Sequence, residues 1–154
     1  MIKAWRIFQA KHAGQALSGQ GARQFGGRWN SKGTAVVYAS SSLALGLLEI
    51  MAGLDDYAAL LSGYQYLELE FPAELVETPP AGNLPEDWPR PGHPGLKAIG
   101  DEWVRQGRSA VLEVPSAVLP PQANYLLNPA HRDFARITAG PALALPVDSR
   151  LIKP

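Results

Sequence analysis

The sequence predicts an α+β protein with a small mixed β-sheet at its core and helices packed against it. Two kinds of segment carry this prediction: apolar, β-branched runs typical of strands, and apolar segments bounded by capping residues typical of helices. The two kinds are mixed along the chain without an internal repeat. A length of 154 residues suits one core, so we expect a single domain over residues 1–154.

The first third of the chain predicts two strands separated by a polar stretch. Residues 4–8 indicate a short opening strand, and the apolar, β-branched run 34–39 indicates a buried one. Between them, residues 9–33 are rich in Gly, Gln, Ser and Ala, which predicts loops or a short helix.

A helix is predicted next, over residues 43–52. The serines at 40–42 supply its N-cap and Gly53 ends it. This segment is apolar nearly all round, so we expect the helix to be buried. A second helical piece is predicted over residues 55–61.

The second half of the chain predicts a half-buried strand at 64–71, where polar and apolar residues alternate. Residues 78–95 are rich in proline and glycine and predict a long surface loop. A helix over 96–106, ended by Gly107, and a strand over 110–114, broken at Pro115, follow. Residues 119–129 are expected to be irregular because Asn124 and Asn128-Pro129 are turn signals. A final extended segment is expected over 142–147.

The composition excludes several classes of function. Fourteen basic residues balance fourteen acidic ones without a basic stripe, which argues against nucleic-acid binding. The absence of cysteine excludes disulfides, thiolate catalysis and cysteine-bound zinc, and the three histidines lie too far apart for a helical metal pair. No apolar run is long enough to span a membrane, and the N-terminus lacks a signal-peptide core. We therefore expect a cytoplasmic protein with no metal cofactor and no membrane partner.

The segment Phe25-Gly26-Gly27-Arg28-Trp29-Asn30 is the most informative feature of the chain. The glycines let the backbone approach another group, and the Arg28 fork fits a phosphate or carboxylate. Alternatively, Arg28 is an ordinary surface arginine, Trp29 a core residue and Asn30 a turn residue.

Three further residues have both a chemical and a structural interpretation. Tyr38 either stacks on a planar ring or fills the core. Glu49, a lone carboxylate on an apolar helix, is either a site residue or a structural ion-pair partner. Ser116 lacks the Gly-x-Ser-x-Gly elbow of serine hydrolases, so it either caps a turn or binds a ligand. A cation, an aromatic ring and a carboxylate are the parts needed to hold a nucleotide and act on its sugar.

The chain resembles the RES-domain family of bacterial toxins, named after an Arg, a Glu and a Ser. The matching pieces occur in the family's order over nearly the whole chain. They are Trp5-Arg6, Gly26-Gly27-Arg28-Trp29-Asn30, Val37-Tyr38, Leu47-Leu48-Glu49, Gly100-Asp101-Glu102-Trp103, Val114-Pro115-Ser116, Asn124, and Asn128-Pro129 with His131.

The resemblance implies an ADP-ribosyltransferase-like fold and a toxin that consumes NAD⁺ at the nicotinamide–ribose bond, by phosphorolysis or hydrolysis. It also implies a cognate helix-turn-helix antitoxin that blocks the active site. The name-giving residues map to Arg28, Glu49 and Ser116, which we expect to be catalytic. The residues expected to bind substrate are Tyr38, Trp29, Asn30, Arg6, Asn124 and His131.

The chemistry of NAD⁺ suits these residues, with NAD⁺ as substrate rather than cofactor. Its pyrophosphate suits Arg28, and its cationic nicotinamide suits a stacked ring of Tyr38 or Trp29. Glu49 suits the positive charge that develops on the ribose. The alternatives are a protein ADP-ribosyltransferase toxin, a non-enzymatic module that binds a phosphate or an acidic partner, and an RNA-cleaving toxin, which the neutral net charge disfavours.

Overall fold

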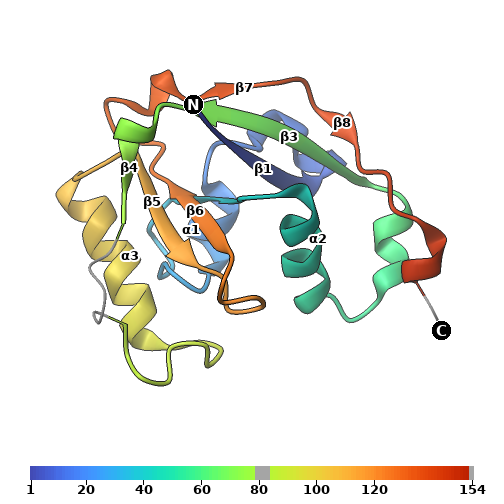
Figure 1. Cartoon of the computed structure of the whole chain (residues 1–154), viewed down its shortest axis with the longest axis horizontal. Helices are drawn as coiled ribbons and strands as arrows, with labels where there is room; N and C mark the ends of the chain where they lie inside the picture. The colour runs from blue at the N-terminus through green and yellow to red at the C-terminus, as the bar shows by residue number, and fades with distance from the viewer. Residues whose placement is uncertain (79–83, 153–154) are drawn as a thin grey trace.

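The computed structural model describes residues 1–78 and 84–152 of the chain. It shows a strongly twisted mixed sheet with helices on its faces (Figure 1). The strands of the described residues are β1 (Ile2–Gln9), β2 (Val37–Ser40), β3 (Tyr64–Phe71), β4 (Val76–Glu77), β5 (Val111–Pro115), β6 (Ala123–Leu127), β7 (Thr138–Ala139) and β8 (Leu143–Ala144). The α-helices are α1 (Gln20–Phe25), α2 (Leu43–Ala52) and α3 (Pro94–Gln106). Short 3₁₀ turns cover Ala10–Gln15, Tyr57–Leu61, Ala73–Leu75, Phe134–Arg136 and Ser149–Leu151.

The sheet order is β4-β5-β6-β2-β1-β3-β7, and β8 also pairs with β3. Only the β4–β5 pair is parallel among the pairings of the described residues, so the sheet is mixed as predicted. The long antiparallel pair β1–β3 confirms the strands predicted at residues 4–8 and 64–71. In β3 the alternation holds as well, because Leu67, Leu69 and Phe71 are buried while the residues between them are partly exposed.

The core has two parts, which lie on opposite faces of β5 and β6. Val111 and Leu127 belong to a cluster that extends under β1 and β3. Leu112 and Leu126, their chain neighbours, belong to a second cluster, under α3, that contains Trp29 and Trp103. Successive side chains of a strand point to opposite faces, so each strand contributes to both clusters.

Helix α2 has the predicted bounds. The Ser42 side chain accepts a hydrogen bond from the Leu45 backbone N–H at 3.0 Å, and Gly53 follows the last turn. The expectation of a buried helix is wrong, however. Only Leu45 and Gly46 are buried, and Leu48 is 39% exposed. The helix packs one stripe against β1 and β2 and leaves the opposite face at the surface (Figure 1).

The expectation of irregular structure over residues 119–129 is also wrong. The segment contains β6, which lies between β5 and β2 with Tyr125, Leu126 and Leu127 buried. The turn signals mark the ends of this strand rather than its absence: Asn128 follows it, and the side chain of Asn124 is occupied in the site described below.

Other elements begin or end a few residues away from their predicted bounds. The strand predicted at 34–39 is β2, at 37–40, and the helix predicted from residue 96 is α3, which begins at Pro94 with the His93 side chain as its N-cap. The strand predicted to break at Pro115 includes that residue. Of the predicted loop 78–95, residues 84–93 contain neither helix nor strand, and residues 79–83 lie outside the described part. None of the helices in the described residues is long and apolar enough to cross a membrane.

Candidate active site

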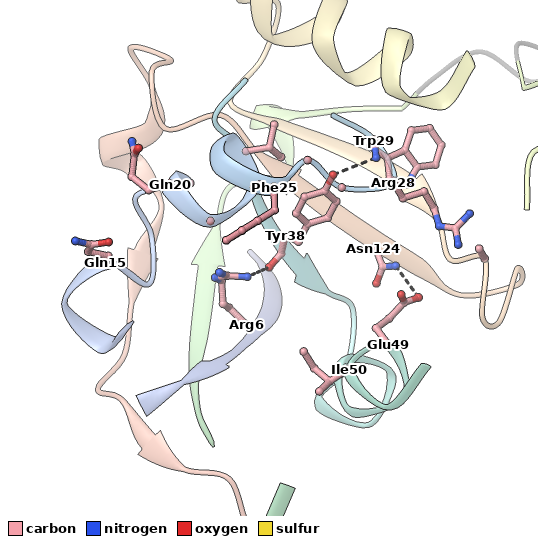
Figure 2. A pocket seen from close by; sticks show the side chains of 17 residues that line it. Arg6, Gln15, Gln20, Phe25, Arg28, Trp29, Tyr38, Glu49, Ile50 and Asn124 are labelled. Carbon is pink, nitrogen blue, oxygen red and sulfur yellow. Dashed lines mark hydrogen bonds between the residues drawn. The ribbon is translucent and has the colours of Figure 1, made fainter. Parts of the chain in front are cut away.

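A cavity of about 500 Å³ lies between α1, α2 and the strands β1, β2 and β6 (Figure 2). Six of the nine residues expected to form the site line it: Arg6, Arg28, Trp29, Tyr38, Glu49 and Asn124. A smaller recess of about 90 Å³ adjoins the cavity and shares Arg6, Tyr38, Glu49 and Asn124 with it. These residues come from both ends of the sequence, and the order of the strands brings them together.

The carboxylate of Glu49 is held by two side chains from the other end of the chain. Its Oε1 accepts a hydrogen bond from Ser116 Oγ at 2.5 Å and another from Asn124 Nδ2 at 3.1 Å. Asn124 is itself oriented, because its Oδ1 accepts from Ser40 Oγ at 2.8 Å. Both partners bind the same carboxylate oxygen, so Oε2 has no protein donor among the described residues.

Ser116 is fully buried, and its hydroxyl is saturated. Its oxygen accepts from the backbone N–H groups of Val118 and Leu119, both at 3.1 Å, and its proton is directed at Glu49. The Ser116 hydroxyl therefore holds two things in place, the turn between β5 and β6 and the carboxylate of Glu49. This arrangement fits a residue that positions Glu49 better than one that attacks a substrate.

Tyr38 links the cavity wall to the Gly-Gly-Arg-Trp-Asn loop. Its hydroxyl donates to Asn30 Oδ1 at 2.6 Å and accepts from the Trp29 backbone N–H at 3.1 Å. Burial raises the pKa of Tyr38 well above its usual range; the Trp29 hydrogen bond opposes this, Asp101 adds to it, and Arg28 opposes it. A Cβ on Gly27 would lie 2.6 Å from the Tyr38 hydroxyl, so this close contact requires glycine.

Arg6 lies at the centre of the cavity, on β1. Its Nε donates to the Ala16 carbonyl at 2.7 Å and its Nη1 to the Tyr38 carbonyl at 3.1 Å. Burial lowers the pKa of Arg6, but a guanidinium is so basic that it stays charged at neutral pH. Its two bonds leave part of the guanidinium free to meet a ligand.

Arg28 lies at the edge of the cavity, and its Nη1 donates to the carbonyls of Pro89 and Arg90. No carboxylate among the described residues lies within ion-pair distance of Arg28 or of Arg6. The cavity thus contains two cations without an acidic partner, a combination that favours an anionic ligand.

Helix α3 holds the loop that carries Arg28. Lys97 Nζ donates to the Gly27 carbonyl at 2.5 Å, and Asp101 Oδ1 accepts from the Ser31 backbone N–H at 2.8 Å. Gly100 lies between them in the helix and lets it approach the Trp29 backbone closely. The loop is therefore fixed from outside the cavity by three residues of one helix.

Two of the predicted binding residues have side chains that are buried in the protein. The indole of Trp29 is 2% exposed and packs in the core under α3, so it is not available as a stacking platform. Asn30 is buried, and its Nδ2 donates to the carbonyls of Ala22, Ser31 and Thr34, which closes the loop. Both residues build the site rather than contact its contents.

His131 lies outside the cavity. Asn124 is at the start of β6, whereas His131 follows the end of that strand, and its Nδ1 accepts from the Asp133 backbone N–H at 3.0 Å. The imidazole caps a turn at the opposite end of β6, and the expectation that His131 binds substrate stays a prediction.

Several cavity residues were not predicted from the sequence. Gln15 and Gln20 line one side of the cavity, Phe25 lies between them and Glu49, and Ile50 follows Glu49 on α2 (Figure 2). The polar composition of residues 9–33 gave no periodic signal for them. The one available signal was Phe25, a large apolar residue directly before Gly26-Gly27.

No group of three or more His, Asp or Glu side chains suited to a metal ion occurs within residues 1–78 and 84–152. The expectation of a metal-free reaction stays a prediction.

Comparison with known proteins identifies the family of the chain. The family model described as the RES domain matches residues 3–148. The chain is 39% identical to "Prs ADP-ribosylating toxin" of Sphingobium sp. (strain YBL2), over 97% of this chain and 96% of that protein. It is 35% identical to "Toxin Res" of Photorhabdus laumondii, over 97% and 96% of the two chains.

The fold is also found in a solved structure. A chain from the crystal structure of the M. tuberculosis MbcT-MbcA toxin-antitoxin complex superposes with a TM-score of 0.75, over 94% of this chain and 84% of that one, at 22% identity. The predicted α+β fold with a small mixed sheet is confirmed.

Proposed function

Since this chain belongs to the RES domain family, we propose that it is the toxin of a toxin–antitoxin pair and that its cavity binds NAD⁺ and cleaves the nicotinamide–ribose bond. The observation that carries the proposal is the carboxylate of Glu49, fixed by Ser116 and Asn124 in a cavity with two arginines that have no carboxylate partner among the described residues. A cavity with this charge pattern suits a ligand that is anionic at one place and becomes cationic at another.

The proposed role of Glu49 follows from the charge that develops during cleavage. As the bond to nicotinamide breaks, positive charge appears on the ribose, as in other oxocarbenium-like transition states. A fixed carboxylate stabilises that charge without reorganising during the reaction. The leaving nicotinamide is neutral, so no strong general acid is required. A free Oε2 on Glu49 suits this role or a hydrogen bond from a ribose hydroxyl.

The two arginines suit the pyrophosphate of NAD⁺. Arg6, at the centre of the cavity, and Arg28, at its edge, supply fixed positive charge from two directions. In this proposal Tyr38 holds the loop of Arg28 in place through Trp29 and Asn30, and its ring forms the wall between the two guanidinium groups (Figure 2).

The acceptor of the ADP-ribosyl group is either phosphate, water or a protein side chain. We propose phosphorolysis or hydrolysis first, because both need only a small nucleophile in the cavity. Transfer to a protein is a second candidate, favoured by the 39% identity to a relative named as an ADP-ribosylating toxin.

Incubation of the purified protein with NAD⁺ tests the proposal, with free nicotinamide and the ADP-ribosyl product measured by mass spectrometry. Reactions with and without inorganic phosphate separate phosphorolysis from hydrolysis, and reactions with a cell extract reveal labelled protein. We expect nicotinamide release that EDTA does not abolish. No release under any of these conditions contradicts the proposal and favours a non-enzymatic binding module.

We also propose an antitoxin partner, a helix-turn-helix protein that covers the cavity. A relative in this fold was solved in a toxin–antitoxin complex, which supports the proposal. We expect expression of this chain to arrest growth and to deplete NAD⁺, and co-expression of the neighbouring antitoxin to restore both. Normal growth and normal NAD⁺ at a high level of folded, unpartnered protein would contradict the proposal.

A further inference from the structure

Phe25 differs from the other phenylalanines of the chain. The sequence has four. Phe8 and Phe71 are buried in the core, and Phe134 packs against it. Phe25 is 72% exposed and lines the cavity. A single exposed apolar residue is common on protein surfaces, but one at the wall of a cavity has a ligand-facing surface.

The position of Phe25 is fixed by the backbone and not by its own packing. Helix α1 contributes no buried residue and begins after Gly19 and ends before Gly26, both with positive φ. Hydrogen bonds hold the helix from one side, from Asn30 Nδ2 to the Ala22 carbonyl at 2.9 Å and from the Gly33 N–H to the Arg23 carbonyl at 2.8 Å. The ring of Phe25 is therefore presented at a fixed place without contributing to the core.

The cavity has an order from one side to the other. Figure 2 shows Glu49 and Asn124 on one side, Gln15 and Gln20 on the opposite side, and Arg6 and Phe25 between them. NAD⁺ has a matching order: the reactive ribose, then the pyrophosphate, then the adenosine. If the reactive bond lies at Glu49, the rest of the ligand extends past Arg6 and Phe25, so the adenosine comes within reach of the Phe25 ring.

We propose that Phe25 is a specificity residue that stacks on the adenine ring of the ligand. This inference rests on the proposed NAD⁺ site and assigns the end of the ligand that does not react. An exposed aromatic ring suits this end, because the adenine needs no exclusion of water for chemistry, whereas the bond at Glu49 does. Stacking of a base on an aromatic side chain is worth about 1–3 kcal/mol when the ring is replaced by alanine, which corresponds to roughly five- to 150-fold in affinity.

The experiment compares two nucleotides that share no base. ADP contains the adenine and the pyrophosphate, and nicotinamide mononucleotide contains the nicotinamide, the reactive ribose and one phosphate but no adenine. We would measure the affinity of each, by calorimetric titration, for the wild type, Phe25→Leu and Phe25→Trp. The matched control is Tyr57→Leu, another exposed aromatic position, 39% exposed and outside the cavity lining.

We expect Phe25→Leu to weaken ADP binding about tenfold and to leave the affinity for nicotinamide mononucleotide unchanged. Phe25→Trp should keep or improve ADP binding, and Tyr57→Leu should change neither affinity. All variants should have the melting temperature of the wild type, because the side chain of Phe25 is largely exposed. A Phe25→Leu protein that binds ADP as tightly as the wild type, or loses both nucleotides equally, overturns the inference, as does a wild type that binds no ADP.

Neither titration depends on turnover, so the two proposals fail separately. ADP binding that requires Phe25 in a protein that releases no nicotinamide contradicts the proposed reaction and supports this inference. Nicotinamide release with the same ADP affinity in wild type and Phe25→Leu supports the reaction and overturns this inference.

Discussion

At the scale of single residues, Ser116 acts through Glu49. Its hydroxyl donates to the carboxylate and accepts from two backbone N–H groups. Ser116→Ala should destabilise the fold by about 1–3 kcal/mol, because two buried donors lose their acceptor. It should also lower turnover about tenfold, since Asn124 alone then holds Glu49. Denaturant unfolding and nicotinamide-release kinetics measure the two effects.

Ser109 offers a matched control for this change. Its hydroxyl accepts from Trp103 Nε1 and donates to the Val111 carbonyl, both at 2.8 Å, away from the cavity. Ser109→Ala should lose stability and keep the turnover of the folded protein. Equal turnover in the two variants would show that Ser116 does not position Glu49. A loss after Ser116→Ala as complete as the loss of Glu49 itself would indicate a direct chemical role.

The burial of Tyr38 should make the stability of the fold depend on pH in the alkaline range. Burial raises its pKa above the ordinary value of 10.0, so the neutral hydroxyl favours the folded state. Its contribution to stability is complete below pH 10 and is lost as the pH rises toward the folded-state pKa. The wild type should lose stability above pH 10, and Tyr38→Phe should lose less over the same range.

Denaturant unfolding at a series of pH values measures this slope. Tyr38→Phe should also be less stable than the wild type at neutral pH, by about 1–3 kcal/mol, because Asn30 and the Trp29 N–H lose their partner. Some alkaline slope should remain, since burial raises the pKa of Tyr125 as well. Identical slopes in the two proteins would mean that the pKa of Tyr38 is the same in the folded and unfolded states.

At the scale of elements, strands with a strong pattern were predictable and the interior strand β6 was not. The alternation in β3 and the serine cap of α2 are local signals, and both elements have the predicted bounds. Strand β6 lacks such a signal because Asn124 interrupts its apolar run. The exposed face of α2 was missed for a related reason: its apolar residues do not indicate which of them meet the sheet.

The contact between α3 and the Gly-Gly-Arg-Trp-Asn loop gives a prediction at this scale. A Cβ on Gly100 would lie 1.7 Å from the Trp29 carbonyl oxygen and 2.8 Å from its carbonyl carbon, and a backbone group yields little. Gly100→Ala should therefore push the helix away, at a cost of about 1–3 kcal/mol or more. Turnover should fall too, because Lys97 and Asp101 move with the helix that fixes the loop of Arg28.

Gly14→Ala is the control for this substitution, since nothing lies within 4 Å of its added Cβ. Its melting temperature should stay near that of the wild type. Gly100→Ala and Gly14→Ala proteins with the same melting temperature and the same turnover would contradict the close packing of α3 on this loop.

At the scale of the whole molecule, the site is assembled by the order of the strands. Strand β2 lies between β1 and β6, and the register aligns Trp5 with Ser40 and Ser40 with Asn124. This places Arg6, Tyr38 and Asn124 around one cavity although they are far apart in the chain. Residue types and a family resemblance were enough to propose the members of the site. Which of them face the cavity depends on β6, so the sequence could not decide whether Trp29 faces the ligand or the core, or how far His131 lies from the other residues.

The central claim is that the carboxylate of Glu49 stabilises a cationic transition state, and Glu49→Gln tests it most directly. Glutamine has nearly the same size, and its Oε1 still accepts from Ser116 and Asn124, so the fold should be kept. Nicotinamide-release kinetics should show turnover lowered by about a hundredfold or more. The affinity for NAD⁺ should change less, because the ribose charge develops only during cleavage.

Glu113→Gln, on β5 and outside the cavity lining, is the matched control and should keep full turnover. The Glu49→Gln protein should have the melting temperature of the wild type, bind NAD⁺ and release almost no nicotinamide. A Glu49→Gln protein that is destabilised and yet turns over NAD⁺ at the wild-type rate would contradict the central claim, because the carboxylate would then be structural.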